Sequence, residues 1–147
     1  MVRGENMNTW KEVMGIGNHF LNQQNWAEAE RHFEEAIYML EEILSKNPRC
    51  VASIQGWIGA HHNLAEMFQN VGKLEDAQRC LLIPHQSMLH VYNHNKDPDL
   101  QLIALSAIKI TLTPLLKFAS LYPPCESCLE QLELQAQLAY RDEPTYH

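Results

Sequence analysis

The stretch from residue 17 to residue 37, GNHFLNQQNWAEAERHFEEAI, decides the fold class of this chain. Its apolar and small residues recur every three or four positions, and this spacing places them on one face of a helix. The spacing extends outward, to Val13 before the stretch and to Leu40 and Leu44 after it. The alternation with a period of two that marks a strand is not sustained anywhere along the chain. The stretch therefore predicts two helices, with a short turn before Trp26.

Capping signals agree with these helices. Thr9 followed by Glu12 has the pattern of a capping box at the start of the first helix. A weaker version of the same pattern, Asn25 followed by Glu28, precedes the second helix. Pro48 is expected to end that second helix, because proline lacks a backbone N–H and its ring clashes with the carbonyl four residues earlier.

Proline and glycine mark the remaining boundaries. Asp97-Pro98 combines a cap residue with a proline in the first helical position. Gly72 and Pro123-Pro124 mark two further turns. The sequence thus predicts an all-α fold of six helices, at about 9–23, 26–46, 50–70, 73–94, 98–120 and 124–140, followed by a flexible tail at 141–147.

Six helices in short-looped pairs suggest an internal repeat. The first pair resembles the tetratricopeptide repeat (TPR), whose skeleton is G-x2-Y…A-x3-F…A. The matching residues are Gly17, Phe20, Ala29, Phe33 and Ala36, with Ile16 in the leucine position. A second set lies 48 residues further on, at Leu64, Ala65, Phe68, Gly72, Ala77 and Leu81. Another 48 residues give a much weaker third set, at Leu112, Thr113, Leu116, Cys125, Leu129 and Leu132.

The resemblance implies a single domain over residues 1–147, built as three antiparallel helix hairpins stacked in a short right-handed superhelix. The hairpins would span about 9–46, 50–94 and 98–140. The TPR period is 34 residues, so the spacing of about 48 implies lengthened helices and a degenerate third repeat. An unrelated six-helix bundle with chance matches is the alternative fold.

In the TPR family the first helix of each pair lines a concave groove that holds a partner's peptide or helix. The resemblance therefore implies a non-catalytic adaptor for a protein or peptide segment. The expected binding residues are Asn18, Asn22, His62, Glu66, Gln69 and Lys117. The family's carboxylate clamp is not supported, because Met14 stands where its lysine belongs and His62 where its next asparagine belongs.

A CxxC motif, Cys125-Glu126-Ser127-Cys128, supports a second hypothesis from a different class. Two thiols at a helix start could form a redox pair or half of a zinc site, because the helix dipole lowers the pKa of the first thiol. Cys125 also occupies a position where a small buried residue is wanted, and free cysteine commonly packs as a small apolar residue. We therefore treat a thiol or metal module as the alternative function.

Other classes are disfavoured by composition. Eleven Lys and Arg against 18 Asp and Glu give a net charge of −7, which argues against nucleic acid or an anionic membrane as partner. The sequence has no HExxH, no G-x-S-x-G and no phosphate-binding glycine loop, so we expect no enzyme activity, no cofactor and no resident metal. Without an export signal, a cytoplasmic location is expected. The leucine-rich third hairpin suggests a homodimer contact.

Overall fold

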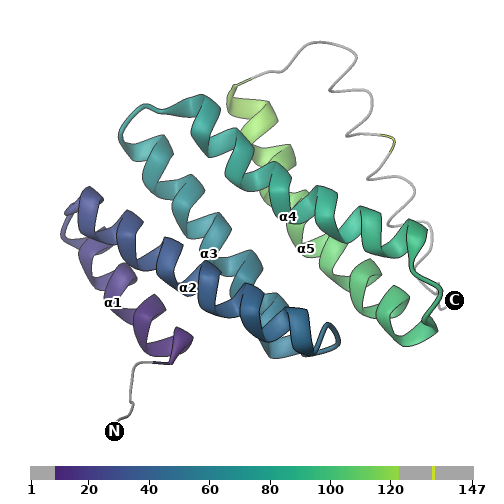
Figure 1. Cartoon of the computed structure of the whole chain (residues 1–147). Helices are drawn as coiled ribbons and strands as arrows, with labels where there is room; N and C mark the ends of the chain where they lie inside the picture. Colours follow the sequence, from purple (N-terminus) through teal and green to yellow (C-terminus); the bar gives the residue numbers. More distant parts are fainter. Residues whose placement is uncertain (1–8, 123–133, 135–147) are drawn as a thin grey trace, which may run out of the picture. The chain divides into compact units, whose positions relative to one another are not determined.

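The structure, a computed structural model, describes residues 9–122 and residue 134 (Figure 1). These residues contain five α-helices and no strand, which confirms the all-α class. The helices are α1 (Trp10–Asn22), α2 (Trp26–Lys46), α3 (Val51–Asn70), α4 (Leu74–His94) and α5 (Pro98–Leu121). Their bounds lie within a residue or so of the predicted ones. The tail and the CxxC motif lie outside the described residues, as does the predicted sixth helix at 124–140 except for Leu134, which is helical.

The two predicted capping boxes have different outcomes. At α1, Glu12 N donates to Thr9 Oγ1 at 3.3 Å, and Thr9 N donates to Glu12 Oε1 at 2.8 Å, so this box is complete. At α2, the side chain of Asn25 makes no capping hydrogen bond, and the prediction there is wrong. Only the backbone carbonyl of Asn25 takes part, as the acceptor for Ala29 N.

The later boundary signals act as expected. Asp97 Oδ1 accepts a hydrogen bond from Asp99 N at 3.0 Å, and Pro98 occupies the first helical position of α5. Gly72, between α3 and α4, has a φ of +79°, a left-handed conformation that favours glycine. Pro84 and Pro114 lie inside α4 and α5, and both helices continue through them.

The chain forms two compact units, one ending at Cys80 and the other beginning at Leu81. In the first unit, α2 packs against α1 and α3, and α1 also contacts α3. The contact between α1 and α2 depends on Gly17, because a Cβ added there would lie 2.7 Å from Cε1 of the fully buried Phe33. Ala29 and Ala77, predicted to be small buried residues, are fully buried.

In the second unit, the remainder of α4 pairs with α5 around a buried polar contact. Nδ1 of His85 lies 2.9 Å from Oγ1 of Thr111, and both residues are buried. Since the Thr111 hydroxyl donates to the carbonyl of Ile108, it accepts from His85. At the loop that connects α4 to α5, the Gln101 amide donates to the carbonyl of Asn95 at 2.7 Å. These bonds set how α5 lies along α4.

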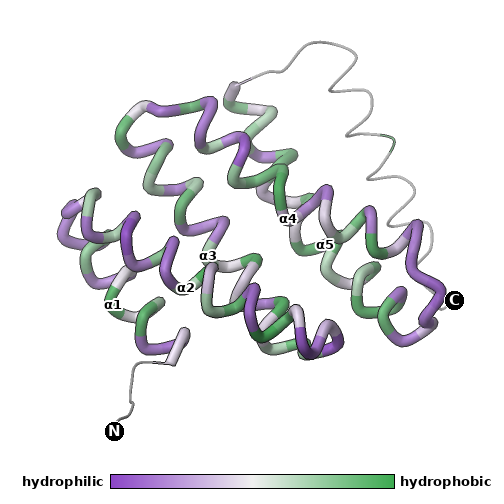
Figure 2. The backbone as a smooth tube through the Cα atoms, viewed as in Figure 1, coloured by the Kyte–Doolittle hydropathy of each residue, from purple (hydrophilic) through white to green (hydrophobic). Residues whose placement is uncertain are grey.

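Helix α5 is the most apolar of the helices along its length, whereas α2 mixes hydrophilic and hydrophobic residues (Figure 2). By length and composition alone, α5 could cross a membrane, and among the residues described it is the one helix that passes this test. The core helix of a soluble protein passes the same test. Nine residues of α5 are buried and recur on one face, from Leu100 to Ala119, which is the pattern of a core helix.

Candidate functional site

Helices α1 and α3 lie side by side and run in the same direction (Figure 1). The ring of Trp10 lies against Gly56, where an added Cβ would come within 2.5 Å of it. One turn further along both helices, Met14 Cε lies 3.9 Å from the corresponding position at Gly59. Because both α3 residues are glycines, the α1 side chains can approach the α3 backbone closely.

The same register continues to an asparagine pair. Nδ2 of Asn63 in α3 donates to Oδ1 of Asn18 in α1 at 3.0 Å, and both residues are half-buried. Asn18 is a predicted binding residue, but Asn63 was not among the predicted ones. The sequence pointed to Asn63 only through its position next to the predicted His62. A repeat pattern does not show which of the neighbouring side chains on α3 contacts α1. The pair is the polar contact that connects these two helices.

His62 is half-buried and has an unsatisfied atom. Its Nε2 is buried and has no hydrogen-bond partner among the described residues. Burial, together with the neighbouring His61, lowers the pKa of His62 to about 4. The imidazole is therefore neutral at physiological pH, and it can exchange hydrogen bonds but carries no charge. Leaving a buried polar atom unpaired costs about 1–3 kcal/mol, which a bound group of suitable chemistry could recover.

The other predicted binding residues differ in exposure. Asn22, the last residue of α1, is exposed, as is Glu66 of α3, while Gln69 is half-buried. On α3, His62, Glu66 and Gln69 are separated by four and three residues and so share one face of the helix. The structure thus gathers five of the six predicted residues on α1 and α3. Lys117 is exposed on α5, in the second unit.

A second polar contact connects α3 to α2. The indole Nε1–H of Trp57 donates to Oε2 of Glu41 at 3.1 Å. The ring of Trp57 also meets that of His61 edge-on, with centroids 4.6 Å apart. Nδ1–H of His61 donates to the Trp57 carbonyl at 2.9 Å, and burial lowers the pKa of His61. Glu41, an exposed residue of α2, therefore has a partner on α3.

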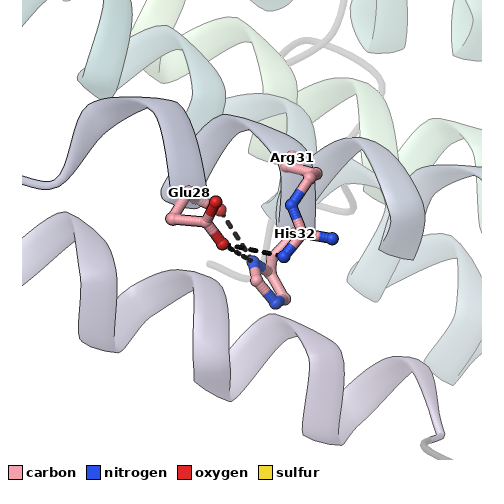
Figure 3. A network of polar contacts seen from close by, with 3 residues as sticks. All are labelled: Glu28, Arg31 and His32. Atoms are coloured by element: carbon pink, nitrogen blue, oxygen red, sulfur yellow. Dashed lines mark hydrogen bonds and ion pairs between the residues drawn. The ribbon is translucent and has the colours of Figure 1, made fainter.

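A small ionic cluster lies at the start of α2 (Figure 3). Nη2 of Arg31 donates to Oε1 of Glu28 at 2.7 Å, and Nδ1–H of His32 donates to the Glu28 carbonyl at 2.7 Å. This hydrogen bond from Arg31 lowers the pKa of Glu28. The pair is exposed to solvent, and such pairs contribute little to stability. The main effect of the pair is electrostatic: the Glu28 carboxylate partly balances the positive charge of Arg31.

The described thiols have opposite environments. Cys50 is half-buried before α3, where a hydrogen bond with the Ser53 hydroxyl, 3.1 Å away, lowers its pKa. Cys80 is buried, and burial raises its pKa to about 11, which makes it a poor nucleophile. Within residues 9–122 and 134, no group of three or more His, Cys, Asp or Glu side chains is arranged to hold a metal ion.

The chain belongs to a family of unknown function: the family that matches residues 8–146 is described as "Protein of unknown function (DUF2753)". This match covers nearly the whole chain. No curated protein and no solved structure matches the chain at a significant level.

Proposed function

We propose that this protein is a non-catalytic adaptor, built from TPR-like hairpins, that binds a protein or peptide segment along the polar face of α1 and α3. The observation that carries the proposal is the parallel register of these two helices. Trp10, Met14 and Asn18 of α1 meet Gly56, Gly59 and Asn63 of α3 in the same order along both helices. This is the relation that first helices have in successive repeats, where they line the binding groove.

The chemistry of this face suits a partner's polar groups. Amides offer both a donor and an acceptor, and Asn22 and Gln69 are available beside the asparagine pair. The half-buried His62 is neutral, so it adds no charge to this face. Few charges and several amides favour recognition of main-chain N–H and C=O groups. In the same proposal the protein acts in the cytoplasm without nucleic acid or membrane.

The test compares paired variants in one capture experiment. Tagged wild-type protein is used to capture partners, and the bound segment is identified and then titrated against purified variants. We expect Asn22→Ala with Glu66→Ala to weaken binding by about 1–3 kcal/mol, because hydrogen bonds to the segment are lost. Glu35→Ala with Glu42→Ala, on the outer face of α2, is the matched control. If the control variant loses binding and the groove variant does not, the proposed site is wrong.

The thiol or metal module stays as the alternative function, although none of the described residues favours it. Its motif, Cys125 and Cys128, lies outside the described residues, so elemental analysis is the direct measurement. Stoichiometric zinc in the purified protein, lost in Cys125→Ser with Cys128→Ser, would favour this alternative over the adaptor. A zinc-free protein whose segment binding is unchanged in that double variant would support the adaptor.

A further inference from the structure

The outer face of α2 is centred on an exposed aromatic ring surrounded by acids. Tyr38 is 67% exposed, the largest value among the exposed large apolar residues of the described chain. Glu34 and Glu42 stand four residues before and after it, and Glu35 and Glu41 stand three residues before and after it. Residues three and four apart are neighbours on a helix surface, so the four glutamates surround the tyrosine, and the Glu41 carboxylate also accepts from the Trp57 indole of α3.

Basic residues are few on the helix that carries this acidic face. From residue 32 to residue 45, α2 contains four glutamates and no lysine or arginine. Arg31, at the edge of the face, donates to Glu28 and also attracts Glu35. The pKa of Glu34 is raised, by partial burial and by the neighbouring Glu30. Glu34 and Glu30 therefore repel each other, and a cationic surface would relieve that repulsion.

The outer face of α5 has the opposite character. Leu102, Leu121 and Ile110 are 65%, 58% and 48% exposed, although they lie on the helix whose other face is the core. From Leu100 to Leu121 the helix contains two lysines, Lys109 and Lys117, and no acid. Lys117 is exposed and, by helical spacing, shares the face of Leu102 and Ile110. This face is apolar and cationic.

The two faces also complement each other in chemistry. Tyr38, in the middle of the acidic face, would lie over the exposed apolar surface of Leu102 and Ile110. The exposed Lys117 would then lie beside the glutamates that surround the tyrosine. Exposed apolar area rimmed by complementary charge is typical of a protein interface.

We propose that a second copy of this chain covers these surfaces, with the α2 outer face of one copy packing against the α5 outer face of the other. The contact is heterologous, because two different faces meet. It uses none of the α1 and α3 residues of the adaptor face, so the two proposals can fail or succeed separately. Lys117, expected from the sequence to bind the adaptor's partner, belongs here to the α5 face.

The experiment is sedimentation velocity on the full-length protein over a wide concentration range. Wild type is expected to sediment faster as its concentration rises. Lys117→Glu alone, and Glu34→Lys with Glu42→Lys, should each weaken association about tenfold or more, because each change opposes like charges in the contact. The decisive sample is an equimolar mixture of these two variants. It should regain association, since the intact acidic face of the first variant meets the intact cationic face of the second.

Lys73→Glu, a matched charge reversal at an exposed residue outside both faces, should associate as wild type does. Circular dichroism establishes that each variant is folded, and Tyr38→Ser provides a second, charge-neutral test of the same contact. Wild type that stays monomeric at the highest concentration would overturn the proposal. An equimolar mixture that associates no more than its two components would also overturn the proposal, because that result is expected of a symmetric contact between two α5 faces.

Discussion

Phe33 of α2 packs its ring directly onto the backbone of α1 at Gly17, where an added Cβ would lie 2.7 Å from Cε1 and 2.9 Å from Cδ1 of the ring. The ring is fully buried and has no free space to move into. The closeness of α1 and α2 therefore depends on a residue that has no side chain.

Gly17→Ala is predicted to destabilise the protein. The new methyl group must push the Phe33 ring or separate the helices, and overpacking of this kind costs about 1–3 kcal/mol. Gly15→Ala is the control in the same helix, since nothing lies within 4 Å of a Cβ there. The control should be neutral or stabilising, because alanine favours a helix by about 1 kcal/mol over glycine. Urea unfolding measures both, and equal midpoints for the two variants would contradict the packing described.

Ala29→Leu and Ala77→Leu are each expected to cost about 1–3 kcal/mol of unfolding free energy. Both alanines are fully buried, so a larger side chain has no room. Ala27→Leu, at an exposed position two residues before Ala29, should change stability by no more than about 0.5 kcal/mol. Thermal unfolding followed by circular dichroism is sufficient here. A stable Ala29→Leu protein would mean that α1 and α2 are less closely packed than described.

The Asn18–Asn63 hydrogen bond is predicted to couple the two residues energetically. Asn18→Ala and Asn63→Ala should each destabilise the protein, because the remaining amide is left half-buried and unpaired. The double variant should cost less than the sum of the single ones, by about 0.5–1.5 kcal/mol. Asn22→Ala, at an exposed residue of the same helix, serves as the reference. Strict additivity in the double-mutant cycle would argue against the bond.

Stability is predicted to fall as the pH falls from about 6.5 to about 4, in part because of His62. Burial lowers the pKa of the folded-state imidazole to about 4, whereas an unfolded histidine titrates near its ordinary value of about 6.5. Above about pH 6.5 the imidazole is neutral in both states, and stability is not reduced by its protonation. Below about pH 6.5 the unfolded state binds a proton that the folded state does not, so the free energy of unfolding falls on acidification. His61, whose pKa is also lowered, acts in the same direction.

His62→Gln isolates this contribution. Its unfolding free energy, measured by urea at several pH values between 7.5 and 4.5, should depend less on pH than that of wild type. Glu34 provides an internal contrast, because its raised pKa stabilises the folded state as the pH falls. Parallel curves for wild type and His62→Gln would show that His62 takes up its proton equally well in the folded protein.

Local sequence signals predicted the helices well. The capping box of Thr9 and Glu12, the Asp97-Pro98 start and the Gly72 turn all use interactions within a few residues, and the structure confirms them. The failure at Asn25 has a physical reason: its backbone, at φ −88° and ψ 81°, is not in the extended conformation of a typical capping residue. A neighbouring residue, Gln24, has a positive φ of 61°, so the turn before α2 is tighter than the pattern implied.

What the sequence determined by itself is the periodic part of this protein: the helices, the small residues at Gly17 and Ala29, and the polar face that includes Asn18 and His62. These follow from spacing of three and four residues, which any helix converts into one face. Only the tertiary structure decided which side chains meet across helices. Asn63 donates to Asn18 and Trp57 to Glu41 over 45 and 16 residues of chain, and burial makes the His62 imidazole neutral. Hydrogen bonds and desolvation depend on distances between separate helices, and no local pattern contains those distances.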